Sequence, residues 1–337
     1  MDPVTALRRI AYLLEAEGAA TYKVRAFRKA AGTVAATDAD VLEGLLRSRR
    51  LEQLEGVGST TASVVAEAAA GGVPAYLSAL EARRPQPLDG AAAVLRGALL
   101  GDLHAHSTWS DGGATIEAMA LAAAGVGHRY LALTDHSSRL TVAHGLDATR
   151  LAAQLEEIAR LNDRLAPFRI LTGIEVDIFE DGSLDQDPAL LARLDVVVAS
   201  AHSKLAMEPG PMTRRLVAAV RDPHVDVLGH CTGRLLGGRG RPPSRFDAAT
   251  VFAACAEAGT AVEVNCRPER DDPPDALLAI AVDAGCRFAI DTDAHAEGQL
   301  EWLERGCRRA AAAGIGAERV ENARPLADLL AASSPGA

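Results

Sequence analysis

The sequence has 337 residues, 48% of them hydrophobic and 4% aromatic, a composition that argues against a disordered chain and leaves room for two domains. Its five cysteines have no CxxC spacing, so neither a disulfide framework nor a cysteine zinc site is expected. The formal net charge of −10 is not typical of a nucleic-acid-binding protein, but bound cations would cancel part of it, so charge alone does not decide the partner.

The chain begins with an amphipathic pattern in which Leu7, Ile10, Leu13 and Leu14 form one apolar stripe. Charged residues interrupt this pattern, which therefore predicts a helix rather than a signal peptide. No apolar run is long enough to span a bilayer. We therefore expect a cytoplasmic protein that is not associated with a membrane.

Residues 1–82 are predicted to form a small domain of consecutive short helices. A second apolar stripe begins at Val24 and Phe27, and Thr37-Asp38 is typical of the cap of a third helix. Residues 83–97, which include two prolines, are expected to form a linker.

From residue 98 onward, short apolar runs alternate with stretches of helical period. The runs cover residues 99–103, 130–133, 170–176, 196–200, 225–228, 261–264 and 288–290. Strands that alternate with helices are typical of a parallel sheet, and seven such units are most economically closed as a barrel. Nearly continuous apolar character indicates strands buried on both faces. We therefore predict an α/β barrel over residues 98–337.

Residues of the types that bind metals stand at the ends of these runs. They are His104, His106, Asp111, His136, Glu175, His202, His230, Asp293 and His295. The carboxyl ends of all strands open on one face of a parallel barrel, so these side chains are expected to converge. A single histidine at a strand end is usually only a hydrogen-bonded polar group, but six of the nine histidines share this placement. Imidazoles mixed with carboxylates suit Zn, Mn or Fe, and we predict a metal cluster.

The motifs that carry these residues resemble those of the PHP (polymerase and histidinol phosphatase) superfamily. The similarity extends over roughly residues 98–330 and is strongest to the PHP domain of bacterial family X DNA polymerases. It rests on DLHAHSTWSDG, LTDHS, GIEVDI, SAHS, GHCTGRLLGGR, VEVNCRPERDD and DTDAH. The resemblance implies a distorted seven-stranded β/α barrel that holds two or three divalent ions of Mn, Zn or Fe.

The resemblance also implies a role for each ligand. It assigns His104, His106, Glu175 and Asp293 to the first ion and to the catalytic centre. It makes Glu175 a bridge to a second ion held by His202 and His230, and it gives Asp111, His136 and His295 to a third. Many members of the superfamily have a histidine where this chain has Asp111, whereas aspartate is common in the branch linked to polymerases.

Residues 1–82 resemble the N-terminal helical domain of the same polymerases, through TYKVRAFRKAA and LEGVGSTTASVV. The resemblance implies a helix-hairpin-helix in which Gly56 and Gly58 form the turn. The next helix, beginning near Ser59 and Thr60, would offer backbone N–H groups to a DNA phosphate. An ordinary packing hairpin is the alternative. Only a short linker stands where the polymerases have their palm, and residues 59–65 contain no lysine, so neither polymerase nor Schiff-base lyase activity is expected.

We therefore expect a metal-dependent phosphoesterase that hydrolyses its substrate with a metal-activated hydroxide. The leading hypothesis is a DNA-directed phosphodiesterase, either a 3′-5′ exonuclease or an abasic or 3′-end processing nuclease in DNA repair. Arg234, Arg239, Arg270 and Lys204 are candidates to bind substrate phosphate. The alternatives are a small-molecule phosphomonoesterase of the histidinol-phosphatase type and a non-catalytic DNA-binding module braced by metals. No organic cofactor is expected.

Overall fold

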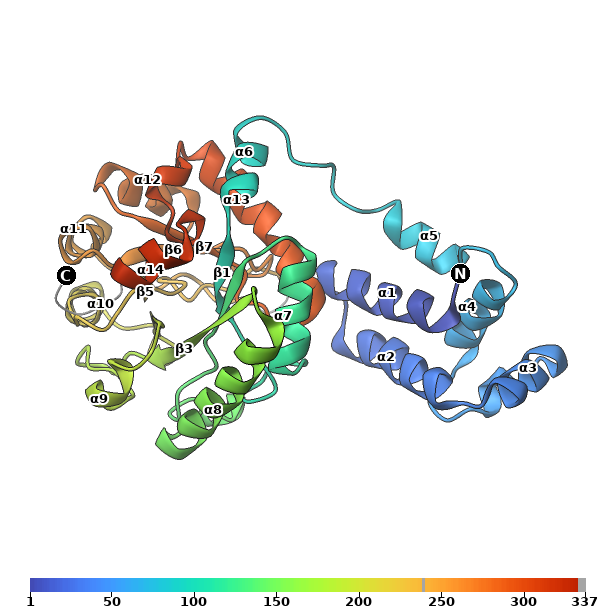
Figure 1. Cartoon of the computed structure of the whole chain (residues 1–337). Coiled ribbons are helices and arrows are strands. Elements are labelled where there is room, and N and C mark those ends of the chain that lie inside the picture. The colour runs from blue at the N-terminus through green and yellow to red at the C-terminus, as the bar shows by residue number, and fades with distance from the viewer. Residues whose placement is uncertain (238–239, 333–337) are drawn as a thin grey trace. The chain divides into compact units, whose positions relative to one another are not determined.

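The structure, a computed structural model, describes residues 1–237 and 240–332 (Figure 1). The chain divides into two compact units, Met1–Pro87 and Leu88–Ala337. Among the described residues, none of the helices has the length and apolar character needed to cross a membrane.

The first unit is helical, as the sequence predicted. Its elements are α1 (Pro3–Ala16), α2 (Thr21–Ala36), α3 (Ala39–Ser48), the short 3-10 helix η1 (Leu51–Gln53), α4 (Ser59–Ala69) and α5 (Ala75–Glu81). Helix α1 packs against α2, α4 and α5, with Leu7, Ile10 and Phe27 in the shared core. The predicted cap of α3 is Asp38, whose side chain accepts the N–H of Asp40 at 2.9 Å.

A tight turn joins η1 to α4. Gly56 lies in the turn with φ of +77°, a conformation that glycine adopts at little cost. Gly58 immediately precedes α4, and its N–H donates to the hydroxyl of Thr61 at 2.9 Å. Ser59 and Thr60 are exposed at the start of the helix. The N–H groups at this end of α4 are therefore presented on the surface of the first unit.

The second unit is a nearly closed barrel of seven parallel strands in the order β1 to β7. The strands are β1 (Gly101–Ala105), β2 (Tyr130–Leu133), β3 (Arg169–Asp177), β4 (Val196–Ser200), β5 (Val227–Leu228), β6 (Ala261–Asn265) and β7 (Phe288–Asp291). Strands β2 to β7 begin within two residues of the predicted runs and end within one residue of them. Strand β1 both starts and ends two residues later than predicted. The difference arises because Leu99 caps the preceding helix instead of entering the sheet.

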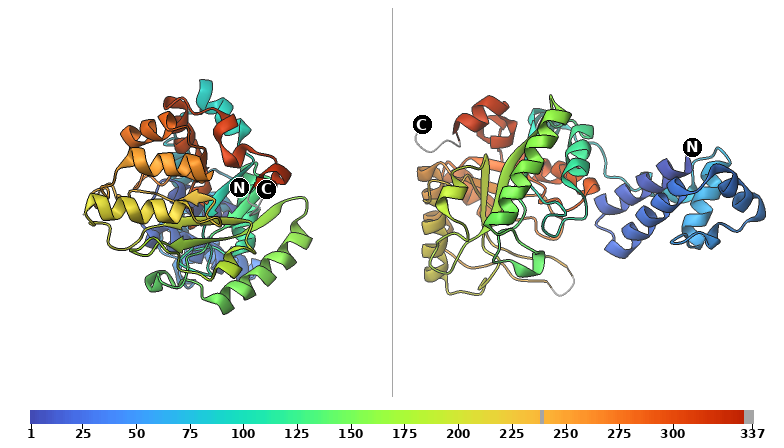
Figure 2. Two further views of the ribbon diagram at one scale, coloured as in Figure 1. Left: turned by 90° about the vertical axis from the view of Figure 1, so that its left-hand side faces the viewer. Right: turned by 60° about the horizontal axis from the view of Figure 1, so that its bottom comes forward.

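Helices surround this barrel (Figure 2, left). They are α6 (Gly90–Ala98), α7 (Ile116–Gly125), α8 (Ala148–Leu165), α9 (Pro188–Leu191), α10 (Pro209–Val220), α11 (Ala248–Ala258), α12 (Asp275–Asp283), α13 (Leu303–Ala312) and α14 (Leu326–Ala332). Helix α6 occupies much of the segment that was expected to be a linker, residues 83–97. Its Leu95 is buried in the core of the second unit, and α6 packs against α13.

Side chains connect the two edge strands of the barrel, β1 and β7. The N–H of Leu103 donates to Asp291 at 2.9 Å, and the hydroxyl of Thr292 donates to Asp102 at 2.5 Å. The buried side chain of Asn322 donates to the carbonyls of Gly101 at 3.0 Å and Ile290 at 2.6 Å. It also accepts the N–H of Ile290 at 3.1 Å. Polar contacts thus close the barrel where a continuous ladder of strand hydrogen bonds is missing.

The closure contacts of Asn322 give the first prediction. Replacing Asn322 with alanine leaves three buried backbone groups without their partners, so Asn322→Ala is expected to lower the free energy of unfolding by about 2–4 kcal/mol. Urea unfolding followed by circular dichroism measures this loss. Glu156→Ala on the exposed face of α8 is the control and is expected to change stability by less than about 0.5 kcal/mol. Equal stability of the two variants would refute the role given to Asn322.

Candidate metal centre

The side chains predicted as metal ligands lie at the carboxyl ends of the strands. Glu175 belongs to β3, and His104 to β1. The others stand in the segments that follow strands: His106, Asp111, His136, His202, His230, Asp293 and His295. Because the strands are parallel, these segments open on the same face of the barrel, and the structure brings all nine residues together.

The buried carboxylate of Glu175 lies at the centre of the cluster. Its nitrogen–oxygen distances to five imidazoles are 3.5 Å for His104, 3.6 Å for His106, 2.7 Å for His136, 3.2 Å for His202 and 2.9 Å for His230. Burial acts to raise the pKa of Glu175, but His136, His202 and His104 outweigh burial and hold the pKa well below its usual value. Glu175 is therefore an anion shared by most of the cluster.

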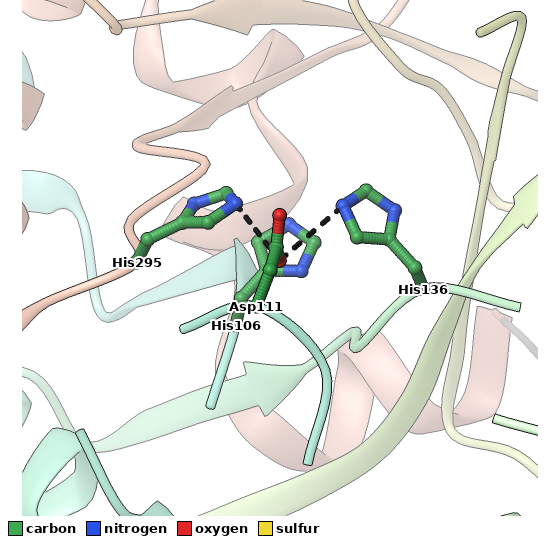
Figure 3. Close-up of side chains that lie close together, drawn as sticks. All are labelled: His106, Asp111, His136 and His295. Carbon is green, nitrogen blue, oxygen red and sulfur yellow. Dashed lines mark ion pairs between the residues drawn. The ribbon is translucent and has the colours of Figure 1, made fainter. Parts of the chain in front are cut away.

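Asp111 joins the cluster from the turn after β1. Its carboxylate faces His295 at 3.2 Å and His136 at 3.6 Å, and His106 lies beside them (Figure 3). Burial acts to raise the pKa of Asp111, but a hydrogen bond from His295 and the nearby His106 and His136 lower it. These four side chains come from three different strand ends, so their meeting depends on closure of the barrel.

The donor atoms have the spacing that a bound ion requires. Three groups each place their donor atoms within 4.8 Å of one another: His106, Asp111, His136 and His295; His104, His106 and Glu175; and His136, Glu175 and His202. Nitrogen and oxygen atoms that share an ion at about 2.1 Å lie about 3.0–3.4 Å apart in octahedral or tetrahedral geometry. The separations of 2.7–3.6 Å around Glu175 bracket this range.

Several of the same atoms are buried without a hydrogen-bond partner. Among the described residues they include Nε2 of His104, His106 and His202, Nδ1 of His136 and Oε2 of Glu175. Nδ1 of His136 and Oε2 of Glu175 lie 2.7 Å apart but do not form a hydrogen bond with each other. Buried polar atoms without partners are rare and call for a ligand. The residues present therefore fit divalent metal ions.

Asp293 is held by two arginines as well as by the cluster. Its Oδ1 lies 3.4 Å from His106 and 3.3 Å from Arg267, and its Oδ2 lies 3.2 Å from Arg270 and 3.2 Å from the amide of Asn265. Burial acts to raise the pKa of Asp293, but Arg267 and the hydrogen bond with His106 hold it well below its usual value. The Asp293 carboxylate is therefore ionised and fixed at the edge of the cluster.

A second layer of carboxylates orients the ligand histidines. Glu263 in β6 lies 2.6 Å from Nδ1 of His104 and accepts the backbone N–H of His230. Asp177 accepts the backbone N–H of His202 at 3.0 Å and lies 3.3 Å from its Nδ1. Burial acts to lower the pKa of His202, but Glu175 and Asp177 together raise it to about 9. Each contact turns the other ring nitrogen toward the centre, as outer partners do in metal sites.

Asp135 orders the turn that carries Asp111. It accepts hydrogen bonds from the backbone N–H of Ser107 at 2.8 Å, from the hydroxyl of Ser110 at 2.5 Å and from Gln154 at 2.6 Å. Burial raises the pKa of Asp135 despite these contacts. The position of Asp111 is therefore set by a carboxylate that belongs to none of the three groups of donor atoms.

The residues predicted to bind phosphate lie in different surroundings. Arg270 is 14% exposed beside Asp293, and two of its guanidinium nitrogens are buried without a hydrogen-bond partner among the described residues. Arg234 donates to the backbone carbonyls of Arg270 and Asp271. Lys204 is 64% exposed and 4.0 Å from Glu180. Arg239 lies outside the described residues.

Sequence reasoning did not single out Glu263, Asp177 or Arg267. Glu263 carries a signal, because it is the one charged residue in the apolar run 261–264. Asp177 stands two residues after Glu175, on the same face of an extended strand. Arg267 has no comparable signal, since its partners Asp293 and His295 are distant in sequence.

Comparison with known families divides the chain in the same way as its fold. Residues 1–74 match the helix-hairpin-helix domain family, and residues 102–267 match the PHP domain family.

Relatives with similar sequences include polymerase-type and phosphatase-type proteins. A Bacillus subtilis (strain 168) protein named DNA polymerase/3′-5′ exonuclease PolX is 41% identical over 233 residues, which cover 69% of this chain and 40% of the relative. A probable phosphatase of Thermoanaerobacter sp. (strain X514) is 28% identical over 234 residues, which cover 66% of this chain and 89% of the relative. This chain therefore spans less than half the length of the Bacillus protein.

Among solved structures, a histidinol phosphate phosphatase of Lactococcus lactis, crystallised with zinc, L-histidinol and phosphate, gives a TM-score of 0.46 at 19% identity. The match covers 64% of this chain and 94% of that chain.

The contact between Glu263 and His104 predicts an effect on metal affinity. Glu263→Gln removes the anion that holds Nδ1 of His104, so metal affinity is expected to fall by about 10- to 100-fold. The measurement is metal content by mass spectrometry after dialysis against buffered Zn²⁺ or Mn²⁺. Glu257→Gln, which changes a surface residue paired with Arg221, serves as the matched control. Metal affinities that are the same in both variants would contradict an orienting role for Glu263.

Proposed function

We propose that the chain is a metal-dependent phosphodiesterase that acts on DNA, because a PHP domain follows a helix-hairpin-helix domain in its sequence. Its similarities to phosphatases and to an exonuclease support a phosphoester hydrolase. The observation that carries the proposal is the cluster of imidazoles and carboxylates around the buried Glu175. The reaction would be removal of nucleotides from a 3′ end, or cleavage at an abasic or damaged 3′ end.

The centre would hold two or three divalent ions of Mn, Zn or Fe, which suit this mixture of nitrogen and oxygen donors. His104, His106 and Glu175 would hold one ion, His136, Glu175 and His202 another, and Asp111 and His295 would complete a third site with His106 and His136. His230 and Asp293 lie close enough to add ligands at the edges. When bound, such ions supply a nucleophilic water at neutral pH and offset negative charge on a phosphate.

The protein's own side chains would orient the phosphate. Nε of Arg270 pairs with Asp293 at 3.2 Å, and its buried Nη1 has no hydrogen-bond partner among the described residues, which supports a role in binding phosphate oxygens. Arg234 would act on Arg270 through the backbone, because it holds the carbonyls of Arg270 and Asp271 in place. Lys204 would approach a phosphate only from the solvent side.

The helix-hairpin-helix domain supports DNA rather than a small molecule as the substrate. The exposed start of α4, with Ser59 and Thr60 after the Gly56–Gly58 turn, would offer backbone N–H groups to a phosphate without reading the bases. The Bacillus relative is named as a 3′-5′ exonuclease, which supports the same substrate. A phosphatase confined to small molecules would have no evident use for this domain.

A small-molecule phosphomonoesterase is the second candidate. The similarity to the probable phosphatase of Thermoanaerobacter favours it, because that match covers 89% of the relative. Both reactions would use the same ions, so the ligand set does not separate them. Separation requires a direct comparison of substrates.

The first measurement is a gel assay with manganese-loaded protein and a 5′-labelled oligonucleotide, in single-stranded and abasic duplex forms. We expect shortened products, or one cut at the abasic site, and loss of these products in His104→Ala by at least about 100-fold. His104→Ala is expected to keep its DNA affinity. His224→Ala, which changes a histidine that pairs with Asp222 outside the cluster, is expected to keep activity. An intact oligonucleotide with phosphate released from histidinol phosphate would instead establish the phosphomonoesterase.

DNA binding by the first unit is tested at Thr60. Aspartate at this position favours the helix through its dipole but repels a phosphate, so Thr60→Asp is expected to weaken DNA binding about 10-fold without loss of stability. The slope of log K against log salt is expected to fall by about 1. Fluorescence anisotropy over a salt series measures both, with Thr60→Asn as the neutral control. Unchanged affinity and slope in Thr60→Asp would exclude this surface from DNA binding.

A further inference from the structure

Arg139 lies beside the candidate metal centre, and among the residues that the structure describes only the Nε of its guanidinium is in an ion pair. We propose that Arg139 binds a second phosphate of the substrate, next along the strand from the one that is cleaved. The inference rests on the proposed function and adds a reason why the site would prefer a polynucleotide to a phosphomonoester. It is carried by the contacts of Arg139 with Phe179 and Asp177.

The guanidinium of Arg139 is fixed on two sides. Its plane lies over the ring of Phe179, 4.7 Å from the ring centroid, and its Nε is 3.0 Å from Oδ2 of Asp177. The side chain is 39% exposed, and its two terminal nitrogens have no partner in the described part of the chain. An arginine held by stacking and by Nε keeps its outer N–H groups oriented for an oxyanion.

The backbone around this pair is also fixed. The N–H of Arg139 donates to Asp185 at 2.6 Å, and the N–H of Phe179 donates to the carbonyl of Ser183 at 2.8 Å. Gly182 in the same turn has φ of +92°, and a Cβ at this position would lie 2.5 Å from Ala218 in α10. The turn therefore packs directly against the barrel helix, and a phosphate meeting Arg139 would require little reorganisation of the protein.

A short chain of contacts connects Arg139 to the metal centre. Oδ2 of Asp177 forms the ion pair with Arg139, and Oδ1 of Asp177 accepts the backbone N–H of His202 at 3.0 Å. His202 in turn lies 3.2 Å from Glu175. Arg139 and His202, a member of the cluster, thus contact the same carboxylate, that of Asp177, on the open face of the barrel. A phosphodiester held at the centre would extend to it through the neighbouring nucleotide.

Other arginines near the opening are engaged elsewhere. Arg234 and Arg150 donate to backbone carbonyls, and Arg267 is bound to Glu269 and Asp293. Arg270 lies 3.2 Å from the predicted ligand Asp293, and the proposed function assigns it to the phosphate that is cleaved. Arg139 differs because its side chain is 39% exposed and its ion pair with Asp177 is made through Nε. It is therefore placed to bind a phosphate that lies outside the metal cluster.

A purely structural role for Arg139 would have different consequences for metal content and substrate preference. If Arg139 only braced Asp177 and His202, its loss would reduce metal content and would affect every phosphoester substrate equally. If it binds a second phosphate, its loss would affect only substrates that have one. The two roles are separated by comparing a single-phosphate substrate with a longer one.

The experiment uses the full-length, manganese-loaded protein and two substrates: a dinucleotide with one phosphate and a ten-nucleotide single strand of the same base. Arg139→Ala is expected to lower kcat/KM on the longer strand by about 10- to 100-fold, mainly through KM, and to change it less than about 2-fold on the dinucleotide. Arg139→Lys is expected to recover only part of the loss. Arg221→Ala, on the surface near Glu257, is the matched control. Metal content and thermal stability are measured for every variant.

Two outcomes overturn the inference and remain distinguishable. Equal losses on both substrates, or reduced metal content in Arg139→Ala, would make Arg139 a brace for Asp177. Wild-type protein that hydrolyses small phosphomonoesters but leaves both nucleic-acid substrates intact would overturn the DNA-directed function, and the Arg139 subsite would fall with it. A selective loss on the longer strand, with full metal content, would establish the subsite.

Discussion

The arrangement of the second unit depends on one buried anion, the carboxylate of Glu175. An isolated buried charge is strongly unfavourable, so it must be matched by charge or by directed hydrogen bonds. Five imidazoles from four strand ends surround it, and none of them is its neighbour in sequence. A divalent ion would balance this carboxylate with two positive charges at short range. The charge at the centre of the barrel therefore links the fold to metal binding.

Closure of the barrel between β1 and β7 is the second requirement, because ligands from both strands share the cluster. Asp102 and Asp291 meet at this seam and connect the strands. Burial raises the pKa of Asp102 to about 6, and burial together with the charge of Asp102 raises the pKa of Asp291 well above its usual value. Both shifts act to reduce the negative charge that the two carboxyl groups hold at the seam.

The sequence was sufficient to predict the strands and the converging ligands, because both follow from local patterns: apolar runs and the polar residues that end them. It was less informative where a residue acts through distant partners. Glu263 stands inside an apolar run, and the contacts of Arg234 with the backbone carbonyls of Arg270 and Asp271 could not be predicted from its place in the sequence. Helix α6 was assigned to a linker because two prolines precede it, although Leu95 packs in the barrel core. These features depend on contacts across the fold, which a local pattern does not contain.

Charge placement, rather than total charge, would decide whether an acidic chain can act on the proposed DNA substrate. The net charge of −10 opposes long-range attraction to DNA, but screening limits that repulsion to roughly 8 Å at physiological salt. Within this distance, the fixed positive groups determine whether a phosphate is attracted or repelled. Arg267 and Arg270 are bound to Asp293, so they mainly offset its charge, whereas Arg139 shares Asp177 and keeps outward-facing N–H groups. A strand would therefore be favoured only where its phosphates reach the few positive groups beside the opening of the barrel.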